Sequence, residues 1–474
     1  MSWELRERIR RGPARLLASR PTRQTRASTL QRLGIHRHPA DEGYRIRSTG
    51  RRVGARRAKR VFPRRSALSL TVLIDAHHPS VDASLHEYRS GRTEEILMKT
   101  FVHRGQITKV VFGSGTRSRI PQEADALGCR RVLILCTPGQ VEQAAQMRDL
   151  LGAAAAGTFT EAAAHTPVDV TEKAVAYART VGADSVLALG GGSTIGLGKA
   201  IAVRTGLRQL ALPTTYAGSE MTPILGETEG RRKTTRRLPE VLLNTVVYDV
   251  DLTLTLPMAT SVVSGINAMA HAVEALYAQD RDPVAFLMAG EALDSLIRSL
   301  PVVARRPDDV AARADALYGA WLAGTCLGTV GMALHHKVCH VLGGTFGLPH
   351  AETHAVVLPH VVAHNGPAAP EAMARIAQAL PGDDAATGLF DFAGRLGAPR
   401  ALRDLGMPES GIEQAAELVM RDGYWNPRPV DRIAVRALLT RAWAGEAPSV
   451  SPGNEDPQSD SVIEASTTTG ARHA

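Results

Sequence analysis

The chain has few cysteines and no long apolar run. Its four cysteines (Cys129, Cys136, Cys326 and Cys339) include no pair at C-x-x-C spacing, which favours reduced thiols in a cytoplasmic protein. No apolar stretch approaches the ~18 residues that cross a bilayer, so we expect no membrane contact. With 474 residues, 44% of them hydrophobic and 22% charged, the chain is long enough for two domains with separate cores.

The excess of positive charge is confined to one end of the chain. Residues 1–97 hold 22 basic residues, 21 of them Arg, against 9 acidic ones, whereas residues 98–474 hold 34 basic and 38 acidic. A basic arm can bind nucleic acid, but this one has no repeat and no interleaved aromatics. We therefore predict that residues 1–97 are an extension outside the folded protein, either disordered or preceding a true start at Met98, and we expect no nucleic-acid partner.

From residue 98 onward, short apolar runs alternate with helical periods. Helices are predicted at 140–151 and 171–181, and strands at 110–115, 131–136, 185–189, 210–213 and 246–249. Such alternation predicts a parallel sheet covered on both faces. Strand signals stop near Leu252, and residues 258–444 carry only helical periods. We predict an α/β cofactor-binding domain over 98–252, an all-helical domain over 253–446, and a disordered tail over 447–474.

A glycine-rich turn, Gly190-Gly191-Gly192-Ser193-Thr194, joins a predicted strand to a helix. Glycines let the backbone approach a phosphate, and the helix N-terminus presents N–H groups to it. The spacing is not that of a P-loop, because Ala200 stands where Ser or Thr would bind magnesium, nor is it G-x-G-x-x-G. Taken alone, the turn favours a phosphate-bearing cofactor but is also compatible with a tight turn that binds nothing.

Hydroxyl residues follow two other predicted strands. Thr214, Thr215 and Ser219 follow the strand at 210–213, and Thr137 follows the strand at 131–136. Because ligands of open parallel sheets bind at the carboxyl ends of the strands, we predict that these residues contact a dinucleotide. An acid at position 137 would bind the 2′-hydroxyl of NAD and repel the 2′-phosphate of NADP, so the uncharged Thr137 predicts tolerance of both.

Histidines recur at helical spacing in the second half of the chain. Asn267 and His271 are four residues apart, as are His336 and His340, so each pair shares one face of a helix; His350 follows shortly after. One Asp and three His would bind a divalent cation well, but Asn267 stands where the Asp would be. The neutral amide predicts that no metal is tightly bound.

Taken in order, these motifs resemble the iron-containing alcohol dehydrogenase family over about residues 98–446, and nothing in 1–97 matches it. Four stretches look like the branch of that family that reduces maleylacetate to 3-oxoadipate with NADH or NADPH, late in the breakdown of aromatic and chloroaromatic compounds. The stretches are Gly192-Ser-Thr-Ile-Gly-Leu-Gly-Lys-Ala200, residues 213–226, Ala333-Leu-His-His-Lys-Val-Cys-His340 with its continuation to Phe346, and Tyr424-Trp-Asn-Pro-Arg-Pro-Val430.

The resemblance implies a dehydroquinate synthase-like fold with cofactor and substrate in a cleft between the two domains, and a homodimer. The family's metal ligands fall on Asn267, His271, His336 and His350, so the missing carboxylate again favours a metal-free site. The three histidines would then stabilise negative charge on the substrate, and His340, which corresponds to a histidine beside the nicotinamide, would transfer a proton.

Other residues in these stretches have weaker assignments. His354 and His360 lack a matched role and are expected to be structural or surface residues. The small-molecule substrate is a dicarboxylate, so Lys233, Arg236 and Arg428 are candidates to bind it, with Tyr424 and Asn267 as polar contacts; the three cations would equally suit a solvated surface.

Three alternatives stay open. The first is an iron- or zinc-dependent dehydrogenase of a small alcohol, against which Asn267 argues. The second is a nucleic-acid-binding protein that uses residues 1–97, which would bind with strong salt dependence. The third is a catalytically idle relative, although the glycine turn and all three histidines are present.

Overall fold

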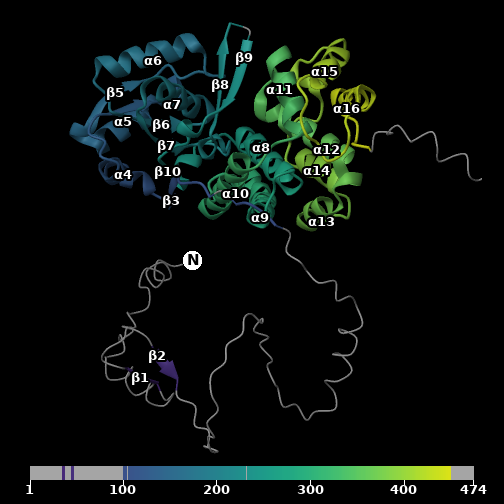
Figure 1. Ribbon diagram of the computed structural model, residues 1–474, viewed down its shortest axis with the longest axis horizontal. Coiled ribbons are helices and arrows are strands. Elements are labelled where there is room, and N and C mark those ends of the chain that lie inside the picture. Colours follow the sequence, from purple (N-terminus) through teal and green to yellow (C-terminus); the bar gives the residue numbers. More distant parts are fainter. Residues whose placement is uncertain (1–34, 38–43, 47–99, 104, 231, 450–474) are drawn as a thin grey trace, which may run out of the picture. The chain divides into compact units, whose positions relative to one another are not determined.

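The structure, a computed structural model, describes residues 100–449 except 104 and 231, together with residues 35–37 and 44–46 (Figure 1). The chain divides into two units, Met1–Ile96 and Leu97–Ala474. In the first unit, β1 (Ile35–Arg37) pairs antiparallel with β2 (Tyr44–Ile46). Apart from these two strands, the predicted N-terminal extension lies outside the described residues, and so does the predicted disordered tail from residue 450 onward.

A six-stranded parallel sheet forms one part of the second unit, in the order β3-β10-β7-β6-β4-β5. Its strands are β3 (Lys109–Gly113), β4 (Val132–Leu135), β5 (Ala155–Phe159), β6 (Ser185–Gly190), β7 (Arg208–Pro213) and β10 (Thr245–Asp249). After β4, the chain adds β5 on one side of it. It then returns to add β6 on the other side of β4, and β7 and β10 continue in that second direction. The order therefore switches between β4 and β6, and a crevice for ligands is expected at their carboxyl ends.

Successive residues of the central strands pack on opposite faces of the sheet. Val132 and Ile134 belong to a cluster with α4 (Ile120–Ala126) and α5 (Val141–Leu151). Leu133 and Leu135 belong to a cluster with α6 (Val168–Thr180) and α7 (Gly192–Thr205). Because both faces are covered, these strands are apolar throughout, which is why they were predicted from the sequence.

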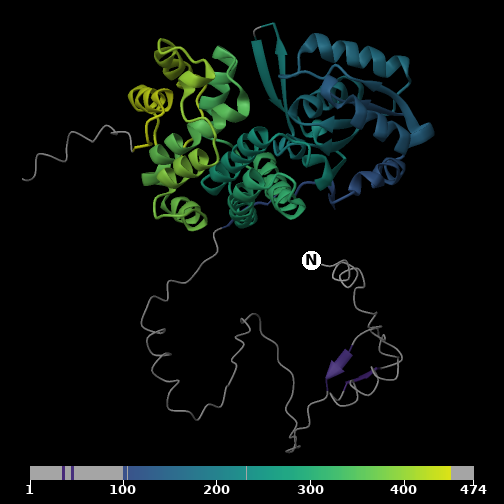
Figure 2. The same cartoon turned by 180° about the vertical axis from the view of Figure 1, so that it is seen from behind.

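Within the second unit, three strands were not predicted from the sequence. An antiparallel hairpin of β8 (Ile224–Glu229) and β9 (Arg232–Arg237) follows the loop after β7 and rises beside the sheet on the side of α11 (Figures 1 and 2). Its residues are mostly charged or Thr, so they lack a buried-strand pattern. The edge strand β5 reads Ala-Ala-Gly-Thr-Phe, which has little strand propensity.

Nine helices of the described chain make up the other part of the second unit. They are α8 (Met258–Leu276), α9 (Pro283–Arg305), α10 (Val310–Thr329), α11 (Leu334–Phe346), α12 (His350–Asn365), α13 (Pro370–Ala379), α14 (Ala385–Arg395), α15 (Gly411–Val419) and α16 (Arg432–Ala444). Four of them, α9, α10, α14 and α16, begin at an Asp whose side chain accepts a backbone N–H of the first turn. The predicted fold class, a parallel-sheet part followed by a helical part, is confirmed.

Helix α8 is the centre of the helical part. All of its residues from Ser261 to Leu276 are buried. Its apolar side chains share one core with residues of β6, β7 and β10 and with helices α9, α10 and α12. A helix that is buried all round is held in place from every side, so polar side chains on it are positioned accurately.

Short 3-10 helices connect these elements. They are η1 (Thr116–Arg119), η2 (Pro138–Gln140), η3 (Gly152–Ala154), η4 (Ser219–Met221), η5 (Pro239–Val241), η6 (Val250–Thr253), η7 (Gly366–Ala368) and η8 (Leu402–Leu405). Within the described residues, no helix has by itself the length and apolar content to cross a membrane. Only α10 and α11 taken together meet that test, and they are bent by 95° relative to each other.

Candidate active site

The glycine turn lies at the carboxyl end of β6, at the point where the strand order switches. Gly190 has φ +144°, and a Cβ there would lie 2.5 Å from Thr194 Oγ1. A Cβ on Gly191 would lie 2.9 Å from the side chain of Thr215. Glycine is therefore required at both positions for the turn to pack against these threonines, and the turn leads into the N-terminus of α7, whose N–H groups could bind an anion.

Hydrogen bonds join the predicted cofactor residues to one another. Thr137 Oγ1 donates to Gln140 Oε1 at 2.9 Å, and Gln140 Nε2 donates to Thr214 Oγ1 at 3.2 Å. Gln140 was missed, although it stands three residues after Thr137 where a helix was expected to begin. The buried hydroxyls of Thr194 and Ser219 have no hydrogen-bond partner within the described chain. Buried polar atoms are usually paired, so these two fit the phosphates or ribose of a dinucleotide.

Lys199, on α7, holds the loop after β7 in place through hydrogen bonds. This buried lysine donates to the carbonyls of Ser219, Thr222 and Ile224 at 2.6–3.0 Å. Burial lowers the pKa of Lys199 to about 7, and the nearby carboxylate of Glu220 opposes that shift. Lys199 therefore holds the loop and η4 in place from within the protein, and a direct phosphate contact is not needed to explain it.

Four residues from three elements form a continuous chain of contacts in the interior. His336 Nδ1 lies 2.6 Å from Glu274 Oε2, and His336 Nε2 lies 2.9 Å from His271 Nδ1. His271 Nε2 lies 3.2 Å from the carbonyl oxygen of Ala217, in the loop after β7. The chain thus links α11 and α8 to the sheet part. Asn267 lies one turn before His271, with its Nδ2 3.4 Å from His271 Nε2.

Two proton counts fit this chain. If His271 Nε2 donates to the Ala217 carbonyl, the three contacts need three N–H protons, one more than two neutral imidazoles carry. If His271 Nε2 instead accepts from Asn267 Nδ2, two neutral rings suffice. Burial, together with the charge of His336, places the pKa of His271 well below its usual value, so a positive charge on that ring is disfavoured.

Glu274 is a functional residue that was not predicted. It is fully buried, and its carboxylate also accepts the backbone N–H groups of Ala333 and His335 at 3.0 and 2.8 Å. It therefore fixes both the His336 ring and the N-terminus of α11. A signal was present in the sequence, because Asn267, His271 and Glu274 stand at i, i+4 and i+7 on one helix face.

Further histidines surround this chain. The exposed His340 and His350 rings are stacked, with centroids 6.4 Å apart, and His340 lies 6.1 Å from His336. His354 is fully buried, with its ring centroid 4.4 Å from that of His350 and 5.1 Å from that of His336. A structural or surface role was expected for His354, but its ring contacts those of the predicted catalytic residues His336 and His350. His360 is also buried, against Phe390.

The candidates for substrate carboxylate binding are more scattered. Arg236 Nη2 donates to Glu227 Oε2 at 2.7 Å within the β8–β9 hairpin, so its charge is engaged there. Lys233 lies in β9. Arg428 Nη1 donates to the carbonyl of His364 at 3.0 Å.

Tyr424 lies close enough to Glu274 for the charge of that carboxylate to affect its phenol. Burial, with the charge of Glu274 adding to it, raises its pKa to about 12, so it stays a neutral phenol. Its buried hydroxyl has no hydrogen-bond partner among the described residues. Asn426, two residues later, accepts the N–H of Leu334 at 3.3 Å at the start of α11. Tyr424 and Arg428 were predicted to bind substrate. The segment that carries them also holds the N-terminus of α11 in place through Asn426.

The four positions that hold a metal in the resembled family are a poor fit for a dication. Asn267 is a neutral amide, and its Oδ1 is buried without a hydrogen-bond partner in the described chain. Both ring nitrogens of His271 and of His336 already have partners inside the protein. A dication would have to break the 2.9 Å contact between these rings without gaining a carboxylate, which disfavours binding.

Comparison with known proteins agrees with the geometry. Residues 108–250 match the family model described as iron-containing alcohol dehydrogenase, and residues 261–443 match its C-terminal domain. A maleylacetate reductase of Rhizobium sp. strain MTP-10005 is 54% identical over 351 residues, covering 74% of this chain and 100% of the relative. The crystal structure of maleylacetate reductase from Agrobacterium tumefaciens superposes with a TM-score of 0.72 at 54% identity, over 74% of this chain and 100% of that one.

A more distant neighbour is similar in fold alone. Sulfoacetaldehyde reductase from Bifidobacterium kashiwanohense, solved in complex with NAD+, superposes with a TM-score of 0.66 at 21% identity, over 73% of this chain and 99% of that one.

Proposed function

The chain belongs to the iron-containing alcohol dehydrogenase family, and we propose from that premise that it reduces maleylacetate to 3-oxoadipate with a nicotinamide cofactor. It is an oxidoreductase. The single observation that carries the choice of branch is the contact chain from Glu274 through His336 and His271. We propose that this chain holds a protonated imidazole, its charge balanced by the Glu274 carboxylate, where other members of the family are expected to hold a metal ion.

The reaction requires a stabilised negative charge and a proton. A reduced nicotinamide, when bound, supplies a hydride to the alkene carbon remote from the ketone. The ketone oxygen of the substrate then gains negative charge as an enolate. His336, kept cationic by Glu274, stabilises that charge, and the exposed His350, whose ring contacts those of His340 and His354, is a second candidate to interact with it. His340 delivers the proton to the carbon next to the ketone.

The cofactor site supports both forms of the nicotinamide. The N-terminus of α7 and the partnerless hydroxyls of Thr194 and Ser219 suit phosphates and ribose. Thr137 and Gln140, at the end of β4, are uncharged and hydrogen-bonded to each other. A 2′-phosphate meets no carboxylate from these two residues, so NADH and NADPH are both expected to work. The choice between them, a homodimer, a cytoplasmic location and a role in aromatic breakdown stay predictions.

An absorbance assay tests this function. The full-length protein is treated with a chelator and given maleylacetate with NADH or with NADPH, and absorbance is followed at the reduced-nicotinamide band. Loss of absorbance that depends on maleylacetate is the expected result. Activity that appears only after iron or zinc is added, with a small alcohol and NAD, would overturn the proposal in favour of a metal-dependent alcohol dehydrogenase.

The absence of a tightly bound metal at the family position is part of this proposal, and replacing Asn267 with Asp tests it. The new carboxylate would supply the missing anionic ligand beside His271. We expect iron(II) affinity to rise at least about 100-fold, since an outer partner of a metal site alone is worth about 10- to 100-fold. Maleylacetate turnover should fall, because the carboxylate lowers the positive potential around His336.

Competition with a chromophoric chelator measures this affinity, and Asn267→Ala is the matched control. Tight iron(II) binding by the unaltered protein, abolished by His350→Ala, would contradict the metal-free assignment. An Asn267→Asp variant that binds iron(II) no better than Asn267→Ala would show that the amide is not what excludes the ion.

A further inference from the structure

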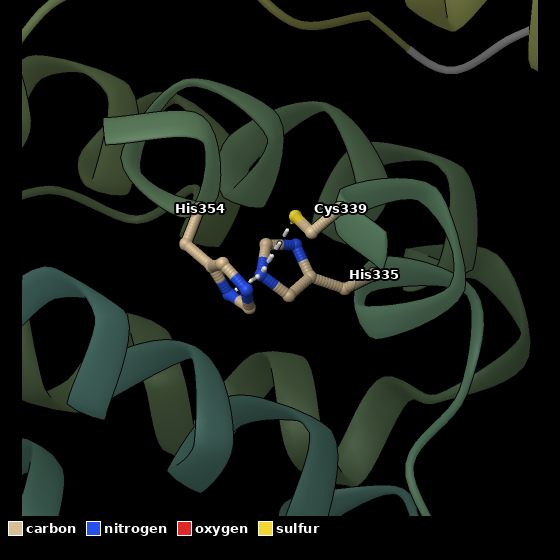
Figure 3. A group of neighbouring side chains, drawn as sticks. All are labelled: His335, Cys339 and His354. Atoms are coloured by element: carbon tan, nitrogen blue, oxygen red, sulfur yellow. Dashed lines mark hydrogen bonds between the residues drawn. The ribbon is translucent and has the colours of Figure 1, made fainter. Parts of the chain in front are cut away.

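A second set of metal-ligating side chains lies next to the histidine chain and is separate from it. His335 and Cys339 are one turn apart on α11, and His354 faces them from α12 (Figure 3). One ligand atom of each lies within 4.8 Å of the other two, and all three side chains are buried. Among the described residues, this is the one group of His, Cys, Asp and Glu side chains that gathers so closely.

The distances are near those of a tetrahedral site. Cys339 Sγ lies 3.7 Å from His335 Nε2, and two such ligands on one zinc ion would be about 3.6 Å apart given usual bond lengths. His335 Nε2 lies 2.9 Å from His354 Nδ1, where zinc would require about 3.3 Å. Shifts of a few tenths of an ångström at this pair, with the thiol turned toward the ion, would create the site.

The donor set is different from that of the family position. One sulfur and two imidazoles form a soft N/S site that selects zinc or copper(I) over iron(II) and magnesium. We propose that His335, Cys339 and His354 bind a thiophilic metal ion, with zinc(II) as the physiological candidate and water as the fourth ligand. This inference does not depend on the proposed reaction, because it concerns none of the four family ligand positions.

The helix that carries two of the ligands is held firmly. The α11 N-terminus is fixed by Glu274 and Asn426, so His335 and Cys339 lie on a rigid helix. His335 Nε2 and His354 Nδ1 face each other across one hydrogen bond, and a metal ion between them would take the place of that bond. The opposite ring nitrogens, His335 Nδ1 and His354 Nε2, are buried without partners in the described chain and would not be ligands.

Binding involves one exchange of protons. The Sγ–H bond of Cys339 breaks, its proton leaves to solvent, and Sγ donates an electron pair to the metal, with no change of oxidation state. Burial, with the charge of Glu274 adding to it, keeps the pKa of the Cys339 thiol well above its usual value, so the free site holds a neutral thiol. The bound ion would place positive charge one ring from His336, and zinc would therefore act as a modulator of the neighbouring histidines.

Cobalt(II) titration of the chelator-treated, full-length protein tests the site. A thiolate–cobalt bond produces a charge-transfer band in the near ultraviolet, and residues 1–97 contain histidines but no cysteine, so that band cannot come from the extension. We expect one cobalt(II) per chain with this band, displaced by zinc(II). Cys339→Ala should abolish the band. Cys326→Ala, which removes another buried helical thiol that contacts the Ala285 carbonyl, should keep it.

The outcomes separate this site from the family position. Saturation without a thiolate band, or binding abolished by His350→Ala and unaffected by Cys339→Ala, would place the ion at the family position and overturn the proposal. No cobalt(II) binding by the unaltered protein would overturn it as well. Because the band is read in the unaltered protein, a Cys339→Ala variant that fails to fold does not remove the test; Cys339→Ser then serves as the milder substitution, and it should also lose the band.

Discussion

Replacing Glu274 with Gln should lower kcat for maleylacetate about 10²- to 10³-fold, the usual cost of losing one group that stabilises a developing oxyanion. The glutamine is nearly isosteric, but it has no charge to keep His336 protonated. The site then has neutral rings where the enolate needs a cation.

The substitution has a structural cost that must be separated from this effect. Each carboxylate oxygen of Glu274 accepts one backbone N–H, from His335 or from Ala333. In Gln, one of these oxygens becomes an NH₂ group, which cannot accept a hydrogen bond. One buried N–H loses its partner, which costs about 1–3 kcal/mol of stability. Thermal unfolding of the variant should show that loss while the protein stays folded at assay temperature.

Glu123 offers the matched control for this experiment. It is a buried carboxylate with cationic partners, Lys109 at 2.6 Å and Arg119 at 3.2 Å, and it lies on α4, away from the histidines. Glu123→Gln should lower the unfolding temperature and leave kcat close to that of the unaltered protein. If a folded Glu274→Gln variant turned over within about twofold of the unaltered protein, the cationic role of His336 would be wrong.

The sequence predicted the parts of the fold in which periodicity and burial agree. The apolar strands β4 and β6 and the helical region from Met258 to Ala444 were found because buried parallel strands and amphipathic helices have strong patterns. The β8–β9 hairpin was missed because its stability comes from strand pairing and charge pairs such as Arg236 with Glu227. Such pairs have no short-range signal in a sequence.

The sequence named candidate site residues one by one, but it did not reveal the contacts that join them. Spacing could identify His271 and His336, yet the 2.9 Å contact between their rings joins residues that are 65 positions apart. Glu274 was overlooked because a lone Glu in an apolar helix resembles a solvated position. Its burial depends on two N–H groups at the start of a helix that begins 60 residues later, which only the tertiary structure reveals. His354 was set aside for a similar reason, since its neighbours come from α11 and α8.

Replacing His340 with Ala should lower kcat about 10²- to 10⁴-fold with little change in stability. A positioned proton donor contributes about that factor, and His340 is exposed, so its removal leaves no buried cavity. Its ring stacks on His350 and meets His336 edge-on, which places it on the open side of the histidine group. KM for maleylacetate should change far less than kcat, because the group acts on the reacting carbon rather than on the carboxylates.

Chemical rescue distinguishes proton transfer from a structural role. Because the position is open to solvent, added imidazole can enter the space left by the His340→Ala side chain and restore part of the turnover. The same addition should not help a Glu274→Gln variant, whose defect is buried. His103→Ala is a control for the loss of a histidine elsewhere: His103 is partly exposed, pairs with Asp282 at 2.8 Å, and should be dispensable for turnover. A folded His340→Ala variant with nearly normal kcat, or with a loss that imidazole leaves unchanged, would mean that the proton comes from another group, with His350 the next to test.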